Sequence, residues 1–220
     1  MFWFRRSAQD QTEEGLGMAL PQFELQTQYT YMDYVTWDEG RWELIEGEVW
    51  DMTPAPSRRH QEISICLSSI LYEFMRKRGC SVYTAPFDVR LPDTSEPQDH
   101  EIFTVVQPDI SIICDSNKLD DRGCVGAPDL IVEILSPSTA ARDLKVKRAL
   151  YEKHGVKEYW LVHPTDKVVM VYLAGDDGQY DKAQIFDQDD RLNSVLFEDL
   201  EINLSDLYLT PHKEPVETRG

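Results

Sequence analysis

The segment DLIVEILSPSTAARDLKVKRALYE, residues 129–152, constrains the fold more than any other part of the chain. Its first half is an apolar run with the length of a strand buried on both faces, and the Pro-Ser-Thr that follows is typical of a turn. Its second half has the spacing of an amphipathic helix over about 140–154, which a His-Gly pair ends. The segment therefore predicts an α/β or α+β domain in which helices pack on a mixed sheet.

Two charged residues stand where this segment should be apolar. Glu133 lies in the middle of the strand, and Lys147 falls on a helix face that can turn inward. An ionised side chain in apolar surroundings is costly unless a partner or a metal ion compensates it. The alternative for Lys147 is a surface pair with Asp143, four residues before it, while Val146 and Leu150 form the apolar stripe.

A second carboxylate, Asp109, opens another apolar strand in VVQPDISIIC. If the two strands are neighbours, Asp109, Glu133 and the backbone carbonyl of Ile134 form an oxygen-rich site for a hard divalent ion such as Mg²⁺. A nearby lysine would neutralise the charge that develops during phosphodiester hydrolysis. For either acid alone, the alternative is a strand residue that reaches solvent or pairs with a base.

Two further elements carry polar residues at inward positions. RWELIEGEVWDMT predicts two short strands around a tight Glu-Gly turn, and it places Glu43 inward or at a sheet edge. A long helix over about 58–78, capped by Ser57, carries His60 on or beside its apolar stripe.

The remaining sequence predicts one domain with polar ends. Residues 1–26 and 211–220 lack a sustained hydrophobic period and are predicted to be a flexible leader and tail, with Met18 as an alternative start. Residues 27–210 suit a single domain. No apolar run approaches the roughly 20 residues that span a bilayer, and the first residues do not form a secretory signal. We therefore expect a cytoplasmic protein that does not associate with membranes.

The formal net charge of −18 argues against a general nucleic-acid binder, because a phosphate backbone repels it. The charge is unevenly distributed, with nine acids and two bases in residues 175–201. By contrast, residues 57–80 hold five bases and two acids, and residues 142–158 hold six bases and three acids. The two helices beside the candidate site are thus locally basic, which favours either an anionic substrate or simply two solvated faces.

The four cysteines show neither a CxxC pair nor histidines at the spacing of zinc ligands. We therefore expect reduced core cysteines and no structural zinc site. The residues are Cys66, Cys80, Cys114 and Cys124.

Five segments in order resemble the Uma-two (Uma2) family, nucleases of the PD-(D/E)xK, restriction-endonuclease-like superfamily. The similarity extends over about residues 30–208. The segments are RWELIEGEVWDMTPAPSRRHQEI, PFDVRL, VVQPDISIIC, PDLIVEILSPST and RDLKVKRALYEKHGVKEYWLVHP.

The resemblance implies an α/β fold with a restriction-endonuclease-like mixed central sheet flanked by helices, an additional N-terminal hairpin and C-terminal strands. It makes Asp109 the aspartate of the PD motif and Glu133 the second acid. The lysine of the family's E-x-K pattern is missing, because position 135 is Leu135. In the family this role is thought to pass to the following helix, which points to Lys147.

Three other residues match family positions as accessory groups. Glu43 corresponds to the early acid, His60 to the histidine on the long helix, and Asp88 in FDVRL to a position that is often polar. The alternative for each is a structural polar contact.

The resemblance also implies an activity and partners. The expected function is a Mg²⁺-dependent endonuclease, with Mn²⁺ as a substitute, that hydrolyses phosphodiester bonds of nucleic acid, DNA in preference to RNA. A homodimer is expected, with its interface at the hairpin or in the Trp-rich region 37–50. The alternative from another class is a catalytically inactive binding or assembly module that retains the nuclease fold and pairs its buried acids with Lys147.

Overall fold

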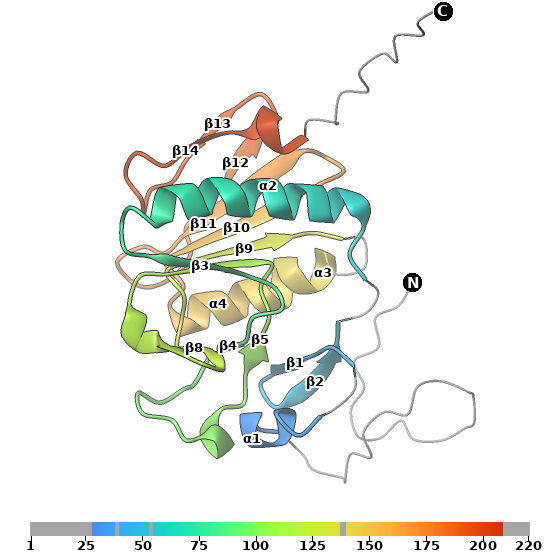
Figure 1. The fold of residues 1–220 in the computed structure, drawn as a ribbon, viewed down its shortest axis with the longest axis vertical. Helices are drawn as coiled ribbons and strands as arrows, with labels where there is room; N and C mark the ends of the chain where they lie inside the picture. Colours follow the sequence, from blue (N-terminus) through green and yellow to red (C-terminus); the bar gives the residue numbers. More distant parts are fainter. Residues whose placement is uncertain (1–27, 38–39, 53–54, 137–139, 209–220) are drawn as a thin grey trace, which may run out of the picture.

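The computed structural model describes four stretches of the chain, which contain all elements shown in colour in Figure 1. The predicted leader and tail, together with Met18, lie outside them. Within these stretches, no helix is both long enough and apolar enough to cross a membrane. The described residues are 28–37, 40–52, 55–136 and 140–208.

A six-stranded mixed sheet, here called the central sheet, has the strand order β12-β11-β10-β9-β6-β3. In it, β9 and β10 run parallel and the other neighbours run antiparallel. A parallel pair needs a crossover connection, and the helical segment between β9 and β10 supplies it. The strands are β3 (Ser81–Thr84), β6 (Ile110–Ile113), β9 (Leu130–Ile134), β10 (Glu158–His163), β11 (Val168–Leu173) and β12 (Gln184–Asp187).

A second six-stranded sheet, also mixed, has the order β2-β1-β5-β4-β8-β7. Its β1–β2 hairpin confirms the predicted turn, in which Glu46 and Gly47 adopt positive φ angles of 51° and 82°. Two such residues in succession match the twist of a two-residue hairpin. The strands are β1 (Trp42–Ile45), β2 (Glu48–Asp51), β4 (Val89–Arg90), β5 (Val105–Val106), β7 (Leu119–Asp120) and β8 (Gly123–Val125).

Helices cover both faces of the central sheet (Figure 1). On one face lies α2 (Arg58–Met75), whose Ser57 side chain accepts the N-cap hydrogen bond that the sequence predicts. On the other face, between the two sheets, lies the crossover segment. The continuous helix expected over 140–154 is interrupted by a π-helical turn: α3 (Ala140–Arg142), η3 (Asp143–Lys147) and α4 (Arg148–His154).

Smaller elements complete the described chain. They are α1 (Tyr31–Tyr34), the 3₁₀ helices η1 (Asp99–Glu101), η2 (Ser116–Lys118) and η4 (Leu204–Tyr208), and the C-terminal hairpin β13 (Arg191–Asn193) and β14 (Glu201–Asn203).

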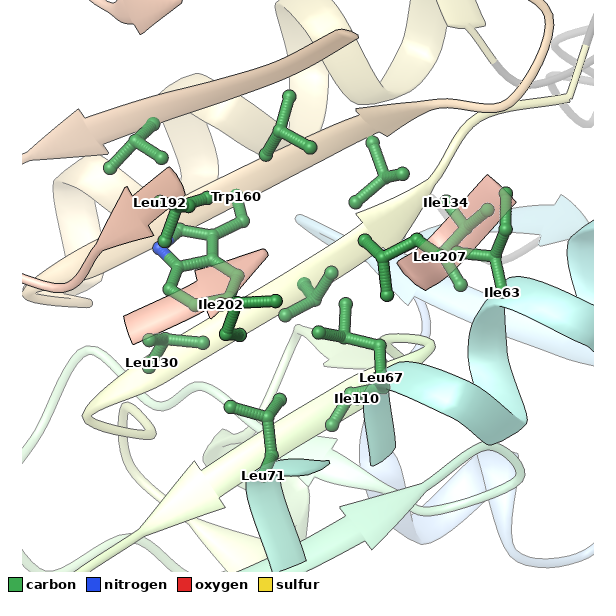
Figure 2. Close-up of a cluster of buried hydrophobic side chains, with 14 of the residues drawn as sticks. Ile63, Leu67, Leu71, Ile110, Leu130, Ile134, Trp160, Leu192, Ile202 and Leu207 are labelled. Carbon is green, nitrogen blue, oxygen red and sulfur yellow. The ribbon is translucent and has the colours of Figure 1, made fainter. Parts of the chain in front are cut away.

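Separate apolar clusters occupy the two faces of the central sheet. The cluster beneath α2 joins Leu67 and Leu71 to Trp160 and to the C-terminal hairpin (Figure 2). The cluster on the opposite face contains Leu150 of α4 together with residues of both sheets. Because the apolar side chains of this second cluster come from both sheets, the crossover helix is packed between two layers. A polar side chain on the helix can therefore contact partners from either sheet.

The expectation of reduced core cysteines is wrong for one pair, because Cys80 and Cys114 form a disulfide. Ser81 of β3 lies opposite Ile113 of β6, and the two cysteines take the next paired position. Cys66 and Cys124 remain free thiols.

Candidate active site

The candidate acids lie at the end of β9, where the central sheet meets the start of α2 and the crossover helix. Ile110 of β6 pairs with Val132 of β9 in antiparallel register, so Asp109 takes the position opposite Glu133. Residues opposite one another in this way have Cβ atoms about 4.5–5.5 Å apart. The neighbouring strands expected from the sequence are therefore present, and their register juxtaposes the two acids.

One oxygen of Asp109 is fixed by two contacts. Its Oδ2 accepts a hydrogen bond from the Ile134 amide at 2.7 Å and lies 3.1 Å from His60 Nε2. Burial alone would lower the pKa of His60, but the hydrogen bond to Asp109 and the negative charge of Asp109, with smaller contributions from Ile134 and Asp143, together outweigh burial and raise it. The ring therefore gains proton affinity from Asp109, and the carboxylate keeps a fixed orientation at the strand end.

Lys147 is the centre of the buried charges. Its side chain is 2% exposed, and Nζ lies 2.9 Å from Glu133 Oε1 and 2.7 Å from Glu43 Oε1. Glu133 belongs to the central sheet and Glu43 to the second sheet, so one ammonium group joins the two layers. The inward orientation expected for Lys147 is thus observed, and Glu43 also faces inward.

Two further residues hold Glu43 in place. Its Oε1 accepts a hydrogen bond from the Gln107 amide at 3.0 Å, and its Oε2 lies 3.5 Å from Arg142 Nη1. Burial would raise the pKa of Glu43, but Lys147 and Arg142 together outweigh burial and lower it. Glu43 is consequently a stable anion whose contacts fix the position of the lysine.

Glu133 has the opposite electrostatic character. Its Oε1 accepts a second hydrogen bond, from the Tyr151 hydroxyl at 2.7 Å. Burial raises the pKa of Glu133 to about 8, with Lys147 opposing the shift and the nearby acids Asp143 and Asp109 adding to it. Carboxylates whose pKa values are pushed apart within one site are typical of acid–base and metal-binding centres.

The π-helical turn explains why sequence reasoning missed Arg142. In a regular α-helix, residues five positions apart point in directions about 140° apart. The i→i+5 bonding of a π turn brings such residues toward one side, and here both Arg142 and Lys147 reach Glu43. The only signal in the sequence was two bases five residues apart.

The remaining candidates are Asp88 and Asp143. Asp88 accepts hydrogen bonds from the Gln107 side chain at 2.8 Å and from the Tyr34 hydroxyl at 3.1 Å. Gln107 links it to Glu43, because the backbone amide of Gln107 donates to Glu43. Asp143 is buried, with its Oδ1 3.8 Å from Arg142 Nε. Its carboxylate adds negative charge near Glu133.

The donor set at the strand end suits a hard cation. In the described part of the chain, Asp109 Oδ1 and Glu133 Oε2 accept no hydrogen bond. Among the same residues, no group of three or more histidine, cysteine or acidic side chains is arranged to hold a metal. Two carboxylate oxygens and a backbone carbonyl nevertheless match Mg²⁺, which keeps several waters and needs only one or two carboxylates.

A family model described as "Putative restriction endonuclease" and named Uma2 matches residues 30–205. The chain belongs to the Uma2 family. An uncharacterized protein, slr1290, from Synechocystis sp. (strain ATCC 27184 / PCC 6803 / Kazusa) is 28% identical over 152 residues, which is 67% of this chain and 75% of that protein.

A solved structure shares the fold. It is described as a putative nuclease belonging to DUF820 from Anabaena variabilis ATCC 29413, and it superposes with a TM-score of 0.64 at 22% identity. The match covers 82% of this chain and 97% of that one. The predicted family and the mixed α/β fold are therefore confirmed.

Proposed function

We propose that this member of the Uma2 family is a metal-dependent endonuclease that hydrolyses phosphodiester bonds of nucleic acid, DNA in preference to RNA. The observation that carries the proposal is the buried Lys147, which lies 2.9 Å from Glu133 while Glu133 lies opposite Asp109. A lysine beside two strand acids is the combination that the PD-(D/E)xK resemblance requires. Here it is assembled although Leu135 occupies the usual lysine position.

Each side chain has a distinct part in the proposed site. Asp109 and Glu133, with the Ile134 carbonyl, would hold Mg²⁺ or Mn²⁺, and the ion when bound would supply Lewis acidity at the scissile phosphate. Lys147 would stabilise the charge that develops on the pentavalent phosphorus or orient the attacking water. Although burial opposes it, the pairing with Glu133 and Glu43 raises the pKa of Lys147, which keeps the ammonium charged.

Two residues act in this proposal by positioning others. Glu43, bonded to Lys147 at 2.7 Å, fixes the direction of the ammonium group rather than binding the ion directly. His60, 3.1 Å from Asp109 Oδ2, orients that carboxylate so that Oδ1 is left for the ion or its waters. This geometry favours a positioning role for His60 over a direct contact with the substrate.

The substrate must bind despite the net charge of −18. Arg58 and Arg59 lie at the start of α2, beside His60, and both are exposed. Lys145 is exposed on the π-helical turn. These bases surround the same end of the central sheet, and we propose that they supply the local positive surface for a phosphate backbone.

The second candidate, an inactive binding or assembly module, is favoured by one observation. Lys147 pairs with both Glu43 and Glu133, as expected if the lysine and the two buried acids serve only to neutralise one another. The two proposals differ in the expected effect of removing Asp109. A nuclease should lose metal binding and cleavage, whereas the ion pairs of an inactive module do not include Asp109.

Cleavage of supercoiled plasmid and of single-stranded DNA with Mn²⁺ tests the proposed function. The wild-type chain is expected to cut, and Asp109→Asn and Glu133→Gln are each expected to lose at least ~100-fold in rate, as loss of a group that stabilises transition-state charge does. Glu158→Gln, which changes another buried glutamate of the central sheet, is the matched control and should retain the activity. Cleavage that persists in both site variants would contradict the proposal.

The assembly we propose is a homodimer. The support is the family resemblance.

A further inference from the structure

The four outer strands of the two large sheets differ in how their edges are protected. Natural edge strands usually carry charged residues that discourage pairing with another chain. Three of the four do so: β2 contains Glu48 and Asp51, β7 contains Asp120, and β12 contains Asp187. The fourth, β3, has the sequence SVYT and no charge at all. The β3 edge is therefore the one whose side chains least oppose pairing with a further strand.

The outer edge of β3 presents backbone groups to solvent. Ala85 donates to the Asp109 carbonyl, so residues 81, 83 and 85 bond inward to β6. Alternation along an antiparallel strand then points the N–H and C=O groups of Val82 and Thr84 outward. No strand among the described residues pairs with this edge.

A hollow between β3 and α2 accompanies the open edge. It is lined by Ser68, Ser69 and Tyr72 of α2 and by Val82 and Thr84 of β3. Ile65 and Tyr72, on the exposed face of α2, are 69% and 56% exposed. The residues that line the hollow are uncharged and partly apolar, and the charged pairs Arg58–Glu62 and Arg76–Glu73 flank this stretch of α2.

The pattern of this face is self-complementary. Along this face the side chains are large, small, small and large: Ile65, Ser68, Ser69 and Tyr72. An antiparallel copy of α2 would therefore place Ile65 of one chain against Tyr72 of the other, with the serines at the centre. An antiparallel copy of β3 likewise puts Val82 of one chain opposite Thr84 of the other, with their outward backbone groups facing. A single two-fold axis that relates both pairings would close the assembly at two copies.

The charge distribution is also compatible with a second copy of this chain at the α2–β3 surface. Two chains that each carry −18 repel one another, and the repulsion is weakest where acids are fewest. Residues 57–80, which contain α2, hold five bases and two acids. The β2 edge, in the hairpin region expected from the sequence to form the interface, carries acids instead.

We propose that the α2–β3 surface is the interface with a second copy of this chain, which joins the two central sheets edge to edge at β3. The proposal does not rest on the nuclease activity, because dimerisation is measured without metal or nucleic acid. The candidate site, at the end of β9, is not part of the shared edge.

Sedimentation velocity of the full chain at micromolar concentrations tests the interface. The wild type should sediment as a dimer. Thr84→Lys, at an exposed edge position, should raise the dimer dissociation constant at least ~100-fold, because each lysine brings an unpaired charge into the interface against Val82 of the other copy, as charged side chains on natural edge strands do to prevent pairing. Ile185→Lys on the other edge strand of the central sheet, where Ile185 is 65% exposed, is the matched control and should remain dimeric.

Three outcomes would overturn the proposal: a wild type that is monomeric throughout, a Thr84→Lys variant that dimerises like the wild type, or dissociation by Ile185→Lys instead. Circular dichroism melting of both variants checks that each is folded. Hydrogen exchange gives an independent reading, since the Val82 and Thr84 amides should be protected in the dimer and lose that protection in Thr84→Lys.

Discussion

Among the described residues, the strands of the central sheet bury one glutamate on each face, and the two have different surroundings. Glu158, on the face that Trp160 shares, receives three neutral donors: Trp160 Nε1 at 2.7 Å, Ser194 Oγ at 2.8 Å and the Leu196 amide at 3.0 Å. These donors occupy both carboxylate oxygens. Glu133, on the other face, receives Lys147 and Tyr151 at a single oxygen. Burial of an acid is thus no sign of function by itself.

The two faces also differ in what surrounds the glutamate. Beneath α2 the packing is apolar, with Leu67, Leu71 and Trp160 in one cluster (Figure 2). Beneath the crossover helix, Lys147 is joined by further buried charges from both sheets and from the helix itself. An uncompensated set of this kind would be expensive. Its retention, while Asp109 Oδ1 and Glu133 Oε2 accept no hydrogen bond from the described residues, is what distinguishes a candidate site from a structural polar contact.

The largest effect is expected from removing the cation. Lys147→Met removes the ammonium group from between the buried Glu43 and Glu133 and should lower the free energy of unfolding by ~3–5 kcal/mol, measured by urea denaturation at neutral pH. Adding Glu43→Gln in the same chain should recover part of the loss, because it removes a buried charge that Arg142 then compensates alone. A loss below ~1 kcal/mol would mean that water reaches Glu43 and Glu133. The charged groups on this face of the central sheet would then not be buried, which contradicts the contrast with the face of Glu158.

A smaller effect is expected from pH. The pKa of Glu133 is raised to about 8 from an ordinary value of 4.5, so its contribution to stability is greatest below pH 4.5 and is lost as pH rises toward 8. The unfolding free energy of the wild type relative to Glu133→Gln should therefore fall over this range, by up to ~1.4 kcal/mol per pH unit. Glu43, with a lowered pKa, has the opposite sign and loses its contribution as pH falls. A wild-type-minus-variant difference that stays flat with pH would contradict the assignment.

The smallest effect concerns one hydroxyl. Tyr151→Phe removes the second donor to Glu133 Oε1 and should cost ~1.5–3 kcal/mol if Glu133 is ionised, but only ~0.5–1.5 kcal/mol if it is protonated. Thermal or urea unfolding at pH 6 and pH 9 separates the two states. The cost should be larger at the higher pH. Equal costs at both values would show that Glu133 does not titrate between them.

Much of this arrangement follows from local patterns in the sequence. Glu133 interrupts an apolar strand, and Lys147 lies on the inward face of the next helix, so both could be identified from periodicity. Asp109 required the further assumption that β6 and β9 are neighbours, which the register fulfils. These residues depend on hydrophobic spacing, which a single sequence displays.

Other features depend on long-range geometry that no local pattern encodes. Glu43 meets Lys147 only because the crossover helix is packed between two sheets. Arg142 joins them through a π turn, whereas the spacing indicated a regular helix. The Cys80–Cys114 disulfide arises from the β3–β6 register rather than from any cysteine motif. In each case the deciding contact joins segments far apart in the chain or depends on an irregular helix.

Calorimetric titration of the full chain with Mn²⁺ and Mg²⁺ tests the central claim most directly, by comparing the two buried glutamates. The wild type and Glu158→Gln should bind the ion alike, whereas Glu133→Gln should bind at least ~10-fold more weakly, since even outer-shell changes at metal sites cost that much. Indistinguishable binding by Glu133→Gln and the wild type, or no binding by the wild type, would contradict the account.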